Sequence, residues 1–121
     1  MITKIIDRIT TYSASISKPI TVVEFGEAEK PAPPYVVVRQ EPDIRGTAFR
    51  VNVHMQPGQQ VALRSFVRDT IGKALDDFKA TDSNGNYNTL NADEGLPSAI
   101  FASNDDQTIS SERLYWMADF I

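Results

Sequence analysis

His54 is the one histidine of the chain, and it lies in a segment whose side chains alternate in character. The segment Phe49–Met55 alternates apolar and polar residues, which is typical of a strand with one buried face. Arg50, Asn52 and His54 then share the other face, and they are the polar groups that a ligand pocket or an acid–base site would use. A strand histidine that faces solvent or a partner is the simpler interpretation, and we predict no catalytic residue.

The stretch Asp82–Asn86 is the other place where residue spacing suggests chemistry. Its oxygen-bearing side chains at positions one, three and five resemble the opening of a calcium loop. The sixth position is Tyr87 where the loop needs glycine, and the twelfth is Asp93 where it needs glutamate. A turn after a helix is therefore favoured over a calcium site. The chain has no cysteine and only isolated glycines, so we expect neither a metal nor a cofactor.

Length and composition indicate a single domain spanning residues 1–121, because most domains contain about 100–150 residues. Charged residues make up 23% of the chain, which is an ordinary value for a globular protein. No apolar run has the length of a signal peptide core or of a membrane-spanning helix, so we expect no membrane partner.

Two amphipathic helices are predicted from apolar spacings of three and four. The first covers residues 2 to about 15, and the second, of about twenty residues, carries its apolar stripe from Leu63 to Phe78. Gly72 lies within the second helix at a cost of about 1 kcal/mol relative to alanine, which suggests a close neighbour.

Five strands are predicted around these helices. Three precede the long helix, at residues 20–25, 35–39 and 49–55, and two follow it, at residues 99–102 and 114–120. In the last strand, Leu114 and Trp116 are expected on the core face, and Tyr115 and Met117 on the outer face. The order α-β-β-β-α-β-β predicts an α+β fold with a mostly antiparallel sheet of four to five strands and both helices on one face.

Charge is distributed unevenly along the chain. Residues 1–79 carry a net charge of +2, whereas residues 80–121 carry −6, within a total of −4. An acidic segment repels phosphates, so non-specific DNA binding there is not expected. The acidic residues form either a solvated surface, or a face that meets a basic partner or lines a channel through which DNA passes.

The order of elements resembles that of the tail terminator, or tail completion, proteins of long-tailed bacteriophages. The resemblance rests on the N-terminal helix, the segment Pro33–Val38, the alternating strand Phe49–Met55, the long helix and the closing strand Arg113–Phe120. It covers nearly the whole chain as an order of elements and involves no specific motif.

The resemblance implies a structural, non-enzymatic subunit of a hexameric ring in the virion neck, made in the host cytoplasm. Such a ring ends the tail tube and joins it to the head connector, with DNA passing through the lumen without specific binding. Subunits of a ring contact their neighbours through two different patches. We place these patches in residues 27–34, in the loop 81–97 and on the outer face of the last strand. The candidate interface residues are Pro33, Pro34, Asn84, Tyr87, Asp93, Glu94, Tyr115 and Met117.

Two alternatives remain open at this stage. One is a small dimeric α+β ligand-binding or enzyme domain with a pocket between helix and sheet, for which Arg50, Asn52 and His54 are the candidate residues. The other is a different neck or baseplate subunit of a phage.

Overall fold

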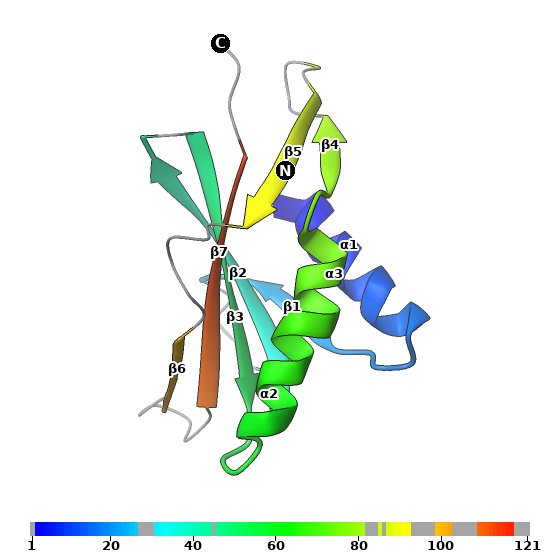
Figure 1. Cartoon of the computed structure of the whole chain (residues 1–121), viewed down its shortest axis with the longest axis vertical. Helices are drawn as coiled ribbons and strands as arrows, with labels where there is room; N and C mark the ends of the chain where they lie inside the picture. The colour runs from blue at the N-terminus through cyan, green and yellow to red at the C-terminus, as the bar shows by residue number, and fades with distance from the viewer. Residues whose placement is uncertain are drawn as a thin grey trace.

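The chain folds into a mixed sheet with its helices packed on one face, as the computed structural model in Figure 1 shows. The structure describes residues 2–26, 31–44, 46–81, 85, 87–92, 99–102 and 109–117, with backbone only at residues 43, 87, 99–102, 109–111, 116 and 117. The helical segments are α1 (Ile2–Ser15), α2 (Gln60–Phe66), a π-helical turn (Val67–Ile71) and α3 (Gly72–Leu75). The strands are β1 (Thr21–Glu24), β2 (Tyr35–Asp43), β3 (Gly46–Met55), β4 (Lys79–Thr81), β5 (Tyr87–Ala92), β6 (Ala99–Ala102) and β7 (Ile109–Met117).

The α+β class and the mostly antiparallel sheet predicted from the sequence are confirmed. Within the described residues the sheet has the order β1-β2-β3-β7-β5-β4, and β6 pairs with β7. The pairing of β1 with β2 is parallel, and every other pairing is antiparallel. Strands β2, β3 and β7 form the centre of the sheet.

Helix α1 has the bounds predicted from its isoleucine spacing. Ile5 and Ile9 are completely buried, so the stripe faces the core as expected. The helix ends where Ser17 adopts a left-handed conformation with φ of 60°. The amide of Lys18 donates to the carbonyl of Ser13, and the amide of Ser17 donates to that of Ala14, which is the Schellman arrangement that closes a helix.

The second helix is interrupted and ends earlier than its apolar pattern suggests. It runs from Gln60 to Leu75 with the π-helical turn in its middle. It stops because Asp76 is extended and Asp77 has φ of 61°, so Phe78 packs against the core from outside the helix. The apolar stripe from Leu63 to Leu75 packs against β3, β5 and β7 in one hydrophobic cluster.

The segment 81–97 was predicted to be a loop, and this was wrong for part of it. Tyr87–Ala92 forms β5, which pairs with β4 on one side and with β7 on the other. Half of its six residues are asparagine or threonine, so it lacks the hydrophobic alternation that marks a strand. Asn88 and Leu90 are buried on one face, which indicates that tertiary pairing determines this strand.

Strand β2 also continues further than predicted. The sequence predicts a strand over residues 35–39, but Pro42 and Asp43 still pair with Thr47 and Gly46. Ile44 follows directly in the turn of the hairpin. Gly46 follows the turn with φ of 140°, a conformation open to glycine and strained for other residues.

Candidate functional site

The face of the sheet opposite the helices carries a group of charged and aromatic side chains, and we call it the distal face. The period of two in β3 places Arg50, Asn52 and His54 on this face, as the sequence predicts. Strand pairing then adds neighbours from elsewhere in the chain. The residues opposite them are Arg39 and Leu114 for Arg50, Val37 and Glu112 for Asn52, and Tyr35 and Ser110 for His54.

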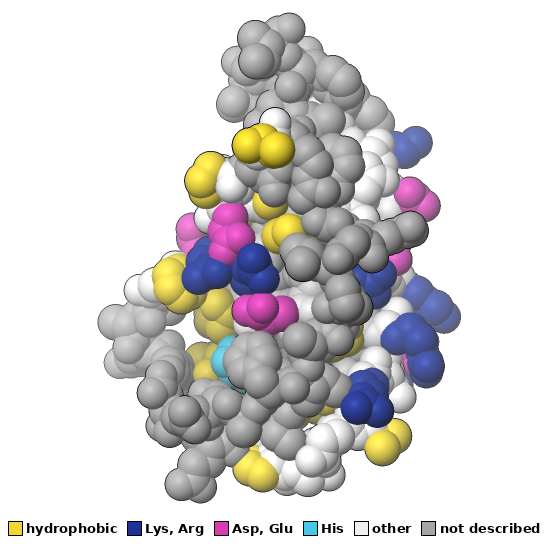
Figure 2. All heavy atoms as spheres, turned by 60° about the vertical axis from the view of Figure 1, so that its left-hand side comes forward, with side chains coloured by type: hydrophobic (Ala, Val, Ile, Leu, Met, Phe, Trp, Pro, Cys, Tyr) yellow, Lys and Arg dark blue, Asp and Glu magenta, His cyan; other side chains and the backbone are white. Residues whose placement is uncertain are grey.

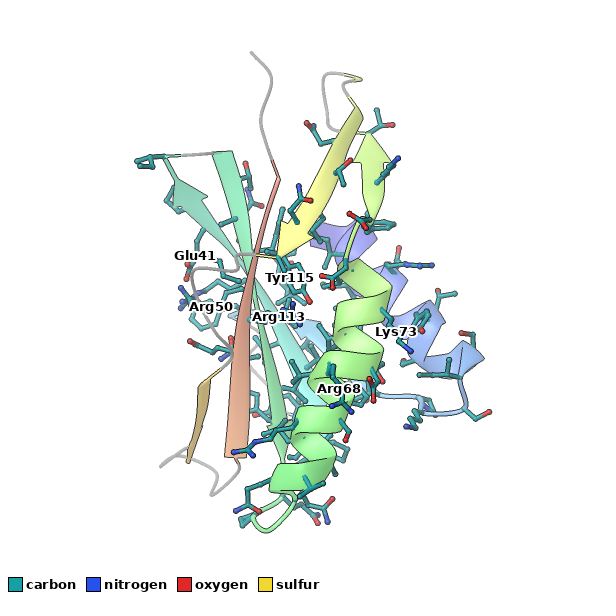
Figure 3. The ribbon with its side chains drawn as sticks, viewed as in Figure 1. Glu41, Arg50, Arg68, Lys73, Arg113 and Tyr115 are labelled. Atoms are coloured by element: carbon teal, nitrogen blue, oxygen red, sulfur yellow. The ribbon has the colours of Figure 1, made fainter. Side chains whose placement is uncertain are left out.

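Arg50 lies at the centre of an ion-pair network on the distal face. Its Nε and Nη2 donate to the two carboxylate oxygens of Glu41 at 3.0 and 3.1 Å, and its Nη1 donates to Glu112 at 3.0 Å. Arg39 also donates to Glu41, and Asn52 donates to Glu112 at 3.0 Å. Figure 3 shows Glu41 and Arg50 on the side of the sheet away from the helix. The network joins three strands and balances two guanidinium groups with two carboxylates.

Hydrogen bonding in this network shifts the ionisation of both partners. The hydrogen bonds from Arg50 hold the pKa of Glu41 below its usual value. The hydrogen bonds to Glu41 raise the pKa of Arg50. Both groups therefore remain charged near neutral pH, and the network is a permanent feature of the distal face.

His54 is stacked on Tyr35 beside this network. The two ring centroids are 4.7 Å apart and the planes differ by 8°. Tyr35 is only 2% exposed although it lies on the distal face. The distal face is thus partly enclosed, and His54 is held by packing in addition to its place on the strand.

A pocket of about 380 Å³ opens beside the stacked rings. Its apolar wall comes from β1 and β2 and from the segments next to them, and its polar wall comes from the network. Figure 2 shows basic and acidic side chains alternating across the middle of this surface, with the histidine below them. The pocket is lined by Val23, Glu24, Phe25, Gly26, Pro31, Tyr35, Val37, Arg39, Asn52, His54 and Glu112.

Arg39 is the cation of this pocket wall. Its guanidinium carbon lies 5.0 Å from the centroid of the Phe25 ring, within the range of a cation–π contact. Its Nε is buried and has no hydrogen-bond partner among the described residues. Phe25 is 60% exposed, so this wall presents an apolar surface next to a donor.

The pocket beside His54 is suited to binding a small ligand. The volume of the pocket lies near the lower end of the range for small-ligand sites, about 300–1,000 Å³. The pocket also combines apolar walls with a few polar groups. Among the described residues, no cluster of three or more His, Asp or Glu residues has the geometry of a metal site. No helix in the described part of the chain is long and apolar enough to cross a membrane.

This pocket lies at a different place from the one expected for a ligand-binding domain. A ligand-binding domain was expected to hold its pocket between helix and sheet, but this pocket lies on the opposite face of the sheet. The space beneath the helices is filled by the hydrophobic cluster that includes Ile5, Phe49 and Leu63.

Six of the eight candidate interface residues lie before β7 in the sequence. Pro33 and Pro34 precede β2, and the peptide bond between them is cis. Tyr87 begins β5. Asn84, Asp93 and Glu94 lie outside the described residues, as does most of the stretch Asp82–Asn86.

Tyr115 was predicted on the outer face of the last strand, and that assignment of faces was wrong. It lies opposite Phe49 in the sheet and is completely buried, on the side of β7 that faces the helix in Figure 3. Leu114 lies on the distal face instead, and Met117 occupies the same face as Tyr115 by register. Both faces of this strand carry apolar residues, so alternation alone does not say which of them meets the core.

Burial also changes the ionisation of Tyr115, because it raises the pKa of the phenol. Arg113 lies on the same face with its guanidinium carbon 5.5 Å from the tyrosine ring. Its hydroxyl is buried in the core and has no hydrogen-bond partner among the described residues.

Sequence reasoning missed Glu41, Glu112 and Tyr35 as parts of the site. Glu41 is nine residues from Arg50 in sequence, and Glu112 is 62 residues away. Only the register of β2 and β7 against β3 brings them together. A half-buried arginine in a strand needs a charged partner, so a search for carboxylates on neighbouring strands could have identified Glu41 and Glu112.

Comparison with known proteins adds no identification. No protein-family model matches the chain, and no curated protein matches it.

Proposed function

We propose that the protein is a structural subunit of a homo-oligomeric ring, with six copies, that ends a phage tail tube and joins it to the head connector. The resemblance in the order of elements supports this proposal. The observation that carries it is the tip of the β2–β3 hairpin, where an isoleucine is exposed on an extension of the sheet.

The hairpin extends beyond the hydrophobic core. On β3 the last buried residue before the tip is Ala48, which lies opposite Glu41, so Pro42 and Asp43 continue past the core while still paired with Thr47 and Gly46. Figure 1 shows the hairpin diverging from β5 and β4 at this end of the molecule. Its turn residue Ile44 is fully exposed, with a relative exposure of 104%.

An isoleucine is an unusual residue for this position. Two-residue hairpin turns favour asparagine, aspartate and glycine, and β-branched side chains gain nothing from an exposed turn. Residues that break the local rules tend to mark functional positions. A contact with another molecule at this position accounts for the apolar side chain of the exposed Ile44.

The remaining surface is consistent with a ring subunit. Helices cover one face of the sheet, which leaves the distal face and the hairpin tip for contacts with neighbours. The net charge of −6 in residues 80–121 suits a lumen through which DNA passes without binding. The partners proposed are copies of this chain, a tail-tube protein and a head-connector protein.

The test is assembly of tail tubes in the presence of this protein. The genes beside this one are searched for a tail-tube protein, which is polymerised alone and with the purified chain, and tube lengths are measured by negative-stain microscopy. We expect ring-shaped caps at tube ends and arrested growth. Uncapped tubes of unchanged length, or the absence of a tail-tube or connector gene nearby, would contradict the proposal.

A second function, binding of a small ligand, is favoured by the pocket beside His54. Its volume of about 380 Å³ and its mixed walls are typical of such sites. This function predicts a thermal shift with some member of a panel of small carboxylates and aromatic compounds, and loss of that shift in His54→Ala. No shift across the panel would count against it.

A further inference from the structure

We propose that Ile44 at the hairpin tip of one copy inserts into the distal-face pocket of the next copy, and that this contact builds the ring. The inference rests on the proposed function, for which it names the contact between subunits. The hairpin tip is defined here as residues 43–46, and the pocket is the one lined by Phe25, Val37 and Arg39.

The tip and the pocket complement each other in character. The tip offers an apolar side chain with no cover, and the pocket offers the apolar side chains of Val23, Phe25 and Val37. A volume of about 380 Å³ accommodates the isoleucine together with part of the turn. Burying such a side chain stabilises a contact by an amount that corresponds to about ten- to a hundredfold in affinity.

Both surfaces also carry charged groups. In the sequence, Ile44 is flanked by an acid and a base, Asp43 and Arg45. The pocket wall carries the base Arg39, which is paired with Glu41, and the acids Glu24 and Glu112, of which Glu112 is paired with Arg50. The Nε of Arg39 has no partner among the described residues, so the wall still holds a hydrogen-bond donor for an acceptor from the tip.

The tip cannot fill the pocket of its own chain. Ile44 lies seven residues beyond Val37 on the same extended strand, a separation of roughly 23 Å at the usual rise of a strand. The two strands stay paired up to Asp43 and Gly46, so the tip cannot fold back. The partner must be a second copy. Because tip and pocket are different surfaces, the contact is head-to-tail, the kind that closes into rings.

The test is a complementation experiment on the full chain, read by native mass spectrometry. Ile44→Asp destroys the tip and leaves the pocket intact, whereas Val37→Arg blocks the pocket and leaves the tip intact. We expect each variant alone to be monomeric and their equal mixture to form dimers and nothing larger. Val61→Asp is the matched control, since Val61 is 80% exposed on α2 and belongs neither to the tip nor to the lining of the pocket. It should assemble as the unmodified chain does.

A second variant covers the case in which Val37→Arg does not fold. The chain has no cysteine, so Ile44→Cys with Val37→Cys in one chain introduces the only two thiols. Mild oxidation should produce a ladder of linked copies in denaturing gels. A cross-link in Ile44→Cys alone would indicate a symmetric tip-to-tip contact and would overturn the inference.

The outcomes separate this contact from the proposed function. Rings that persist in Ile44→Asp, or a mixture of variants that stays monomeric, would overturn the tip contact and leave the ring function standing. Assembly that depends on Ile44 but does not cap tail tubes would support the contact and contradict the function. An unmodified chain that stays monomeric at high concentration would contradict both.

Discussion

Replacing Arg50 with methionine should destabilise the fold more than any other change on the distal face. Arg50 is bound to two carboxylates, and the side-chain exposures are 23% for Arg50, 25% for Glu41 and 32% for Glu112. Exposed ion pairs contribute about 0.2–1 kcal/mol, whereas breaking a fully buried pair costs about 3–5 kcal/mol. At these intermediate exposures we expect Arg50→Met to lower the free energy of unfolding by about 2–3 kcal/mol near neutral pH.

The loss should depend on pH in a direction set by Glu41. The pKa of Glu41 is lowered in the folded protein by the hydrogen bonds from Arg50, from an ordinary value of 4.5. The stability that this shift contributes is therefore fully present above pH 4.5 and is lost as pH falls through the folded pKa. Arg50→Met removes the largest cause of the shift. The difference between the variant and the unmodified chain should be large at neutral pH and shrink at about pH 3.

Urea unfolding followed by circular dichroism, at one protein concentration, measures both effects. Arg68→Met is the matched control, because Arg68 pairs with Asp69 at 3.0 Å with 74% and 43% of the side chains exposed. Arg68→Met should lower the free energy of unfolding much less than Arg50→Met does. Glu112→Gln added to Arg50→Met should recover part of the loss, since Glu112 then carries no unpaired charge and Glu41 keeps Arg39 as its partner. A loss no larger than in Arg68→Met, or one that is the same at both pH values, would refute the reasoning.

Three further substitutions test the core and the second helix by the same unfolding measurement. Phe49→Ala should cost about 3–5 kcal/mol because Phe49 is completely buried, and a cost below that of the exposed Val61→Ala would refute its place in the core. Gly72→Ala should stabilise by about 0.5–1 kcal/mol, since an added Cβ lies 3.4 Å from Arg113 Nη1, an ordinary contact; destabilisation would show that the glycine is sterically required. Tyr115→Phe should leave stability unchanged or raise it, because the buried hydroxyl has no partner among the described residues; a loss above about 1 kcal/mol would contradict this.

Local patterns in the sequence predict the parts of the fold that depend on short-range spacing. The isoleucines of α1 and the alternation of β3 identify their elements and their buried faces, because each has one clearly apolar side. The face of β7 was assigned wrongly because Leu114 and Tyr115 are both apolar, and only the register against Phe49 decides between them. Strand β5 was missed because it lacks a hydrophobic alternation in the sequence. Its pairing with β7 holds it in the sheet instead.

The candidate site could be predicted only in part for a related reason. Arg50, Asn52 and His54 lie on one strand, so their common face follows from the period of two. Their partners come from strands whose register the sequence does not specify. The exposed position of Ile44, on which the proposal rests, was likewise not predicted, because residues 42–46 carry turn signals and the strand nevertheless continues through Pro42.

Native mass spectrometry of the unmodified full chain tests the central proposal, a ring of identical subunits, most directly. We expect one dominant assembly with six times the mass of the 13.5 kDa chain, stable to dilution and lost in Ile44→Asp. A chain that remains a monomer or a dimer at the highest soluble concentration would contradict the account.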